Sequence, residues 1–282
     1  MADQREDVPI IRTKLYRPPV PATFLCRERL RAKLELGREM PLTLVSAPAG
    51  YGKSTLISHW LETSDTSSGW LSLDESDNDL RTFLNYFVAA IRTVDPRACR
   101  DTVNQLAGSD LLPPSVLASC LSNDLDVIAT RLVLALDDYH RIHDAAIHEL
   151  LEHLLKHPLR SVHLVMIARR NPPLPLSSLR ARSLLNEIRA QDLQFQAEET
   201  GSLFEKTVGH TVSRKALSHV QNITEGWAVG LHLVALSLRG KADADSHLRE
   251  MRGDMRYIQE YLVAEVLSHQ VPRFRQCLLR SA

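Results

Sequence analysis

One segment of the chain, TLVSAPAGYGKSTLISHW from Thr43 to Trp60, constrains the fold more than any other. The apolar run Leu42–Ser46, with its β-branched valine, predicts a buried strand. After a glycine-bearing loop, apolar residues return at helical spacing, at Leu56, Ile57, Trp60 and Leu61. A strand, a glycine-rich loop and a helix in this order form the context that a phosphate-binding P-loop requires.

The loop residues have the chemistry that is needed to hold a phosphate chain. Backbone N–H groups of the loop and of the helix start face an anion, and Lys53 reaches the terminal phosphates. Ser54 would supply a hydroxyl to Mg²⁺. The predicted nucleotide contacts are Ala49, Gly50, Tyr51, Gly52, Lys53, Ser54 and Thr55. Ala47 stands where the full pattern begins with glycine, and alanine costs little there unless φ must be positive. The alternative to a P-loop is a chance Gly-Lys-Ser sequence at a helix start.

A P-loop needs an acidic partner for its metal, and the segment RLVLALDDYHRI supplies one. Its apolar run Leu132 to Leu136 predicts a second buried strand, which ends in Asp137 and Asp138. We expect Asp137 to hold Mg²⁺ through the water shell of the ion, and Asp138 to orient or deprotonate the attacking water. Two adjacent acids favour hydrolysis, whereas the alternative interpretation makes Asp138 a helix N-cap.

A third buried strand is predicted for VHLVMIA, from Val162 to Ala168, and it ends in Arg169 and Arg170. A cation at this strand end could sense the γ-phosphate, as an arginine finger supplied by the same chain does. Arg169 is favoured for this role because it is nearer to the strand. The alternative is a pair of surface arginines before the loop NPPLPLS.

The remaining pattern predicts an α/β fold with a parallel sheet that helices cover on both faces. Further strands are expected at Gly69 to Asp74 and near Ile188 to Leu193, and helices from about Asp79 and over IHELLEHLLKH. The second half of the chain shows helical periodicity. Its segment VSRKALSHVQNITEGW has too few basic residues for DNA binding and is interpreted as a structural helix pair, with Trp227 as a core residue.

Composition excludes several classes of function. The chain has 34 basic and 34 acidic residues, so its charge gives no case for a nucleic-acid or membrane surface. Its N-terminus does not resemble a signal peptide, and no apolar run is long enough to span a membrane. Four isolated cysteines fit a reduced cytoplasm. The histidines between residues 140 and 157 are expected at solvated helix positions rather than in a metal site.

Several motifs occur in a family order: CRERLRAKL, SAPAGYGKSTLISHW, GWLSLDESDND, LALDDYHRI, IARRNPPLPLSSLRAR, TEGWAVGLHLVALSL and YLVAEVL. In this the chain resembles the N-terminal module of the MalT-like, large ATP-dependent LuxR-type transcription regulators, which belong to the STAND class of signalling NTPases. The resemblance extends from about Leu15 to Ala282.

The resemblance implies a P-loop ATPase domain over residues 1–195, a small helical domain over 196–254 and the beginning of a winged-helix domain over 255–282. Arg27 resembles a residue of the segment that approaches adenine. Gly226, in Gly226-Trp227-Ala228, resembles the glycine of a Gly-x-Pro element that closes over the nucleotide.

The function that the resemblance implies is a cytoplasmic regulatory switch, in which the ATP or ADP state with Mg²⁺ controls self-association and ATP is hydrolysed slowly. Inducer and DNA would bind C-terminal domains that are absent from this chain, which ends within a helical pattern and is expected to be a fragment. A P-loop kinase is the alternative and would need an acceptor site and an arginine-bearing lid, for which RRNPPLPLSSLRAR is the candidate. A motor ATPase would need a basic nucleic-acid groove, and GTP is disfavoured because no Asn-Lys-x-Asp element occurs.

Overall fold

A computed structural model describes residues 9–209 and 211–239 of the chain. By their contacts these residues form two compact units. The sheet unit comprises the N-terminal residues up to Val20, Glu28–Ala47 and Lys53–Arg189, and the helical unit comprises Pro21–Arg27, Pro48–Gly52 and the residues from Ala190 onward. The predicted winged helix lies outside the described residues, and the predicted domain limits at residues 195 and 254 stay predictions.

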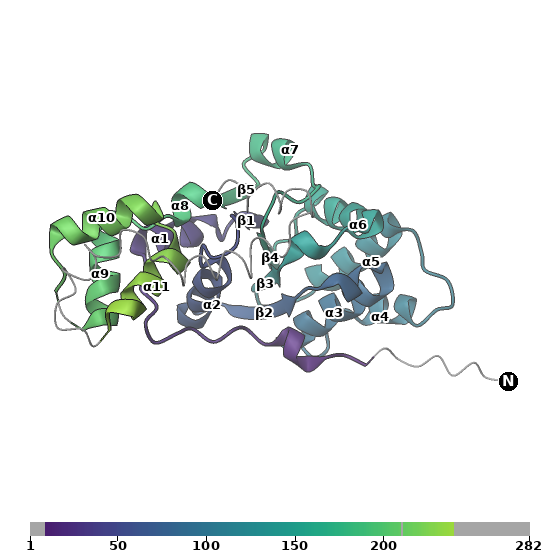
Figure 1. Ribbon diagram of the computed structural model, residues 1–282. Coiled ribbons are helices and arrows are strands. Elements are labelled where there is room, and N and C mark those ends of the chain that lie inside the picture. Colours follow the sequence, from purple (N-terminus) through teal and green to yellow (C-terminus); the bar gives the residue numbers. More distant parts are fainter. Residues whose placement is uncertain (1–8, 210, 240–282) are drawn as a thin grey trace, which may run out of the picture. The chain divides into compact units, whose positions relative to one another are not determined.

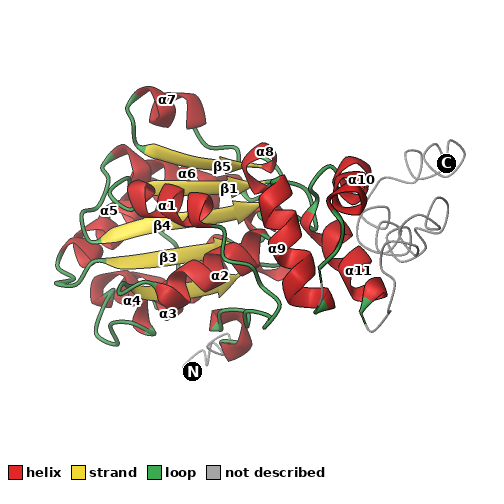
Figure 2. Ribbon diagram, turned by 90° about the vertical axis from the view of Figure 1, so that its left-hand side faces the viewer, coloured by secondary structure: helices red, strands yellow, loops and turns green. Residues whose placement is uncertain are grey.

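The sheet unit is built on a five-stranded sheet in which all pairs are parallel and the strand order is β2-β3-β4-β1-β5 (Figure 2). The strands are β1 (Leu42–Ser46), β2 (Ser67–Ser72), β3 (Leu132–Asp137), β4 (Val162–Ala168) and β5 (Leu185–Arg189). Every residue of β1, β3 and β4 is buried, which requires cover on both faces of the sheet. The predicted α/β class is therefore confirmed.

Helices surround this sheet (Figure 1). They are α1 (Glu28–Gly37), α2 (Lys53–Thr63), α3 (Leu80–Arg92), α4 (Arg100–Leu106), α5 (Pro114–Asp126), α6 (Ala145–Lys156) and α7 (Leu176–Ala181). Side-chain caps fix two of their starts, because Asp79 accepts from the Thr82 N–H at α3 and Asp144 accepts from the Ala146 N–H at α6. Among the described residues, no helix is both long and apolar enough to cross a lipid bilayer.

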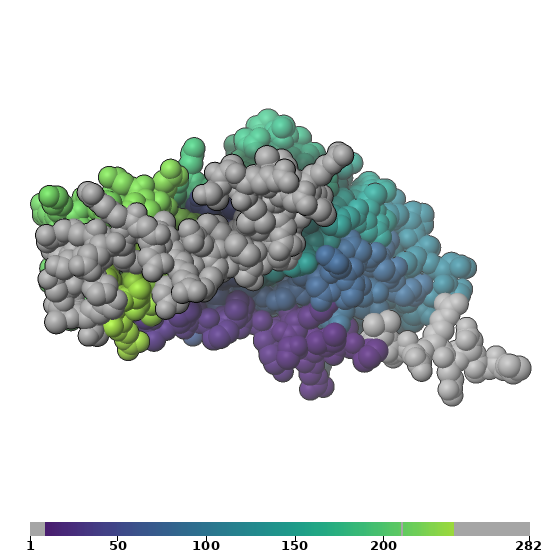
Figure 3. All heavy atoms as spheres, viewed as in Figure 1, coloured from purple at the N-terminus to yellow at the C-terminus, as the bar shows by residue number. Residues whose placement is uncertain are grey.

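The N-terminal segment is fastened to the outside of the sheet unit by a buried ion pair. It contains the short 3₁₀ turn η1 (Arg12–Leu15), which lies at the surface (Figure 3). The Lys14 ammonium lies 2.8 Å from a carboxylate oxygen of Asp77, which has no exposed surface, and 4.7 Å from the centre of the Tyr86 ring. This pairing attaches the chain before α1 to the 3₁₀ turn η2 (Glu75–Asp77), which follows β2.

The helical unit contains α8 (Ala190–Leu193), α9 (Ala197–Val208), α10 (Arg214–Thr224) and α11 (Ala228–Leu238). Phe204 on α9 and Leu231 and Leu238 on α11 are fully buried in its core. The core also receives Val220 of α10, so α10 packs as part of a structural helix pair, as predicted. Two short segments from earlier in the chain, Pro21–Arg27 and Pro48–Gly52, belong to this unit.

The last strand was predicted too late in the sequence. The prediction placed it at Ile188 to Leu193, whereas β5 covers Leu185–Arg189 and α8 begins directly after it. Asn186 explains the error, because this polar residue is buried beside β1 and its amide lies 3.2 Å from the Thr43 hydroxyl. An asparagine that pairs inside the core breaks the apolar pattern by which a buried strand is predicted.

His163 on β4 is expected to make the protein less stable in acid. Its side chain is 1% exposed, and burial lowers its pKa from 6.5 to about 4. Because the unfolded chain then binds a proton more readily, the free energy of unfolding should fall as the pH drops from 6.5 toward 4, by about 3 kcal/mol in total. His163→Gln removes this titration. Between pH 7 and pH 4 the free energy of unfolding, measured with urea, should therefore fall by about 3 kcal/mol less in the variant than in the parent.

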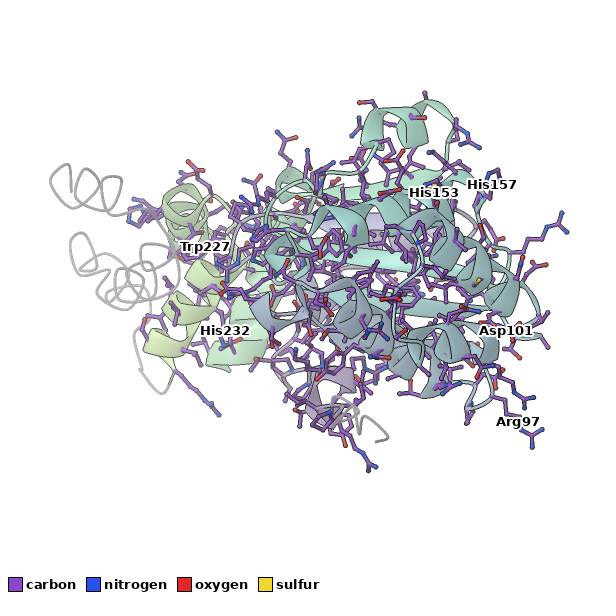
Figure 4. All side chains as sticks on the ribbon, turned by 90° about the vertical axis from the view of Figure 1, so that its right-hand side faces the viewer. Arg97, Asp101, His153, His157, Trp227 and His232 are labelled. Carbon is purple, nitrogen blue, oxygen red and sulfur yellow. The ribbon has the colours of Figure 1, made fainter. Side chains whose placement is uncertain are left out.

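Two features make this comparison specific to His163. Its Nδ1 lies 2.5 Å from the Met40 carbonyl oxygen, to which a glutamine amide can also donate. The matched control is His157→Gln, at an exposed histidine that directly follows α6 on the outer surface (Figure 4). Parallel pH dependences for the parent and His163→Gln would show that this imidazole does not govern the acid sensitivity.

Candidate nucleotide site

The predicted phosphate-site residues of the sheet unit meet at the carboxyl edge of three neighbouring strands. Lys53 begins α2, which follows β1 and its loop; Asp137 ends β3; and Arg169 comes directly after β4. Strand β4 lies between β1 and β3, with Ala168 opposite Ser46 and Met166 opposite Leu136. In parallel α/β sheets ligands bind outside this edge, so the sequence prediction places its residues where binding is expected.

Ser54 and Asp137 form an oxygen-rich pair at this edge. The Ser54 hydroxyl donates to Asp137 Oδ1 over 2.9 Å, and the backbone N–H of Asp138 donates to the same oxygen over 2.9 Å. Burial, followed by the neighbouring charge of Asp138, raises the pKa of Asp137 to about 6. Hydroxyl and carboxylate oxygens are the ligands that Mg²⁺ prefers, and a divalent cation would favour the ionised form of Asp137, so this pair fits the implied metal.

Lys53 is buried at the first position of α2, with 9% of its surface exposed. Burial, followed by the positive charge of Arg169, lowers the pKa of Lys53 to about 8, while the carboxylates of Asp137 and Asp138 act in the opposite direction. Two cations and two acids thus interact at one edge of the sheet. An anion bound at Lys53 would offset the desolvation of its ammonium and the repulsion from Arg169.

Asp138 differs from its neighbour in being half exposed, with 48% of its side chain accessible. Its backbone has φ +54°, which is the left-handed region. It precedes the 3₁₀ turn η3 (Tyr139–Arg141), but its side chain accepts no capping hydrogen bond there. Asp138 thus holds the N-cap position of η3, as the alternative interpretation places it, but its side chain makes no cap, and its carboxylate is accessible at the strand end.

His140 is a residue of this edge that the sequence analysis missed. It was assigned with its neighbours to solvated helix positions, but it lies in η3 with only 14% of its side chain exposed. Its Nδ1 lies 3.7 Å from Asp138 Oδ1. Burial, opposed by Asp138 and reinforced by Arg169, lowers its pKa to about 4, so the ring is neutral at pH 7. The signal in the sequence was its position three residues after Asp137, the acid that ends β3.

His148 is a second departure from that expectation, because its Nδ1 lies 2.7 Å from the hydroxyl of buried Tyr139. Across residues 9–209 and 211–239, no three His, Cys, Asp or Glu side chains gather in a way that could hold a metal ion.

The glycine-bearing loop Pro48–Gly52 belongs to the helical unit by its contacts. Gly50 has φ +78° and Gly52 has φ +73°, so both adopt the left-handed conformations that glycine tolerates best. Tyr51, between them, is half-buried. Ala47 is not among the described residues with positive φ, which explains why alanine can stand where the full pattern has glycine.

Arg27 and Gly226 both contact the segment that follows α8. Arg27 is 3% exposed, donates from Nη1 to the Leu193 carbonyl over 2.6 Å and lies 4.4 Å from the centre of the Phe195 ring. Gly226 has φ +74°, and a Cβ on it would come within 2.6 Å of the Phe195 carbonyl oxygen. These contacts give both residues a role in the helical unit, and their contact with a nucleotide stays a prediction.

Comparisons with known proteins agree with the motif order. No protein-family model matches the chain. It is 34% identical over 275 residues to the HTH-type transcriptional regulator MalT of Klebsiella pneumoniae (strain 342), and 35% identical over 275 residues to MalT of Cronobacter sakazakii (strain ATCC BAA-894). Each match covers 97% of this chain and 30% of the relative, so the chain spans about a third of the length of these curated relatives.

A solved structure supports the fold. The STAND protein PH0952 from Pyrococcus horikoshii, which has a tetratricopeptide repeat sensor, superposes with a TM-score of 0.58 at 14% identity and covers 83% of this chain and 33% of that chain. The resemblance predicted from the motifs is thus confirmed by sequence, and the solved structure agrees with the α/β fold. The chain is a relative of the MalT-type transcriptional regulators and matches their N-terminal part over nearly its whole length.

Proposed function

We propose that this chain is the nucleotide-binding switch module of a signal-responsive transcriptional activator, and that it binds ATP or ADP with Mg²⁺. The observation that carries the proposal is the convergence of Lys53, Ser54, Asp137 and Arg169 at one carboxyl edge of the sheet. Lys53 and Ser54 directly follow a loop with two left-handed glycines. The two cations suit a chain of phosphates, and the Ser54–Asp137 pair suits its magnesium ion.

Each residue of the edge has a distinct task in this proposal. Lys53 would pair with the terminal phosphates, and Ser54 and Asp137 would present oxygen atoms to Mg²⁺, which when bound supplies charge neutralisation. Asp138 has an exposed carboxylate that would orient or deprotonate the attacking water. Arg169 would contact the γ-phosphate and so distinguish ATP from ADP.

The regulatory part of the proposal rests on the relatives, which are transcriptional regulators. With the γ-phosphate present, the protein would favour an arrangement that self-associates. Slow hydrolysis to ADP would end this self-association, because a segment that contacts the γ-phosphate can change its conformation when that group leaves. In the relatives, inducer and DNA would bind parts outside the region that this chain matches. Contacts of Arg27 and Gly226 with the base, and of Ala49, Tyr51 and Thr55 with the phosphates, belong to the same proposal.

The kinase alternative receives less support. Its candidate lid would use Arg180 and Arg182, and Arg180 instead makes two hydrogen bonds to Glu187, over 2.6 and 2.9 Å. That pair lowers the pKa of Glu187 to about 2, with burial opposing and Arg189 assisting. An arginine held by a carboxylate is not presented to a phosphate, and a regulatory ATPase needs no acceptor hydroxyl.

Identification of the nucleotide that copurifies with the protein tests the proposal most directly. We expect mass spectrometry of the denatured protein to find ADP or ATP, and calorimetry of the nucleotide-stripped protein to show binding of both with Mg²⁺. Protein that carries no nucleotide and gives no heat with ATP or ADP would contradict the proposal. ATP consumption that depends on an added hydroxyl metabolite would favour the kinase instead.

A further inference from the structure

Trp227 contacts the glycine-bearing loop, which belongs with it to the helical unit. Its indole Nε1–H donates to the Ala49 carbonyl oxygen over 3.1 Å. Two residues later, the backbone N–H of Val229 donates to the Gly50 carbonyl oxygen over 3.0 Å. The start of α11 therefore holds two consecutive carbonyl groups of the loop.

The indole ring also fits closely between two glycines. A Cβ added to Gly50 would lie 2.6 Å from Cζ2 and 2.7 Å from Nε1 of Trp227, and one added to Gly230 would lie 2.9 Å from Cε3. Gly52 is different, since its added Cβ would meet only the Cβ of Ala228, at 3.9 Å. Gly50 thus serves a close approach of the indole as well as a left-handed turn.

Peptide geometry connects these contacts with phosphate binding. In a planar trans peptide the C=O of one residue and the N–H of the next point in opposite directions. Donors that hold the carbonyls of Ala49 and Gly50 therefore direct the N–H groups of Gly50 and Tyr51 away from α11. A P-loop binds phosphate through such N–H groups, and it binds more tightly when they are oriented before the anion arrives.

We propose that Trp227 is a positioning residue for the nucleotide: its indole holds the loop Pro48–Gly52 in the conformation that presents N–H groups to the phosphates. The inference rests on the proposed nucleotide-binding function and adds a residue that lies far from the loop in the sequence. Trp227 also packs on the core of the helical unit. The proposal therefore makes nucleotide affinity depend on the fit of one helix start against the loop.

The first test compares two tryptophan substitutions in the full chain. Trp227→Phe keeps an aromatic ring against Gly50 and removes the indole N–H, so the dissociation constant for MgADP in calorimetry should rise about 3- to 10-fold. The matched control is Trp70→Phe, which removes an indole N–H that donates to the Ser72 hydroxyl over 3.0 Å on β2, in the sheet unit. This control should bind MgADP within about twofold of the parent.

A second readout does not depend on Trp227→Phe being folded. The sequence has three tryptophans, so Trp60→Phe combined with Trp70→Phe leaves Trp227 as the single indole fluorophore. Its emission should change when MgADP binds, because the phosphates would bind to the loop that the ring contacts. If Trp227 served only the core of the helical unit, its emission should not respond to MgADP.

The outcomes separate this inference from the proposed function. If the parent binds MgADP and Trp227→Phe binds it equally well, Trp227 is a core residue only, and the nucleotide-binding function stands. If Trp227→Phe does not fold, the fluorescence of the variant that retains only Trp227 decides. An emission that does not change when MgADP is added overturns the inference. If the parent binds neither ADP nor ATP, the proposed function fails and the inference fails with it.

Discussion

Lys53→Ala should weaken the binding of MgATP by about 2–5 kcal/mol, which is roughly 30-fold to 5,000-fold in the dissociation constant. Lys53 is the ammonium that the start of α2 presents at the carboxyl edge, and it is almost fully buried there. Its removal leaves the terminal phosphates without their partner in a poorly solvated place, where a lost charge pair costs most. Calorimetry of nucleotide-stripped protein measures the effect.

Two controls separate this loss from a folding defect. Lys53→Met keeps the length of the side-chain stem and removes the charge. Because burial lowers the pKa of Lys53 to about 8, the charged form is costly in the nucleotide-free protein. This variant should therefore unfold at no lower temperature than the parent. Lys215→Ala, at an exposed lysine of α10, should leave affinity unchanged. Parent-like affinity in a folded Lys53→Ala protein would contradict the P-loop assignment.

The strands at the carboxyl edge could be predicted because short-range patterns define them. β1 and β4 have the predicted bounds, and β3 differs only by including Asp137. Each is an apolar run that ends at a charged residue or at the glycine-bearing loop. The same local pattern therefore predicts both the strand and the functional residue that follows it. Parallel α/β topology then brings those ends to one edge, which makes Lys53, Asp137 and Arg169 neighbours although they are far apart in the sequence.

What could not be predicted depends on long-range packing. Ala49 and Trp227 are 178 residues apart, and no local pattern indicates that an indole N–H meets a loop carbonyl. His140 looks like a surface histidine in the sequence, although only 14% of its side chain is exposed in η3, which contacts β4. Asn186 is polar in sequence and buried in the fold, because Thr43 and the Lys33 carbonyl supply its partners. In each case the deciding partner is far from the residue in the sequence.

Asp138→Asn should keep nucleotide binding and remove hydrolysis. General-base assistance is worth about 10²- to 10⁴-fold in rate, so phosphate release should fall by about that factor. Affinity for MgATP should stay within a few-fold of the parent, because Lys53, Ser54 and Asp137 remain. If the nucleotide is a switch, the variant should also copurify with ATP in place of ADP, since it cannot complete the turnover that produces ADP.

Asparagine is the right substitution here for a structural reason. Asp138 has φ +54°, a left-handed conformation that asparagine tolerates well and alanine does not, so Asp138→Asn changes the carboxylate without straining the turn that begins η3. Asp138→Ala would combine a lost base with a strained backbone, and Asp110→Asn at an exposed loop position is the neutral control. Phosphate release at the parent rate from Asp138→Asn would assign water activation to another group, of which Asp137 and His140 are the nearest at this strand end.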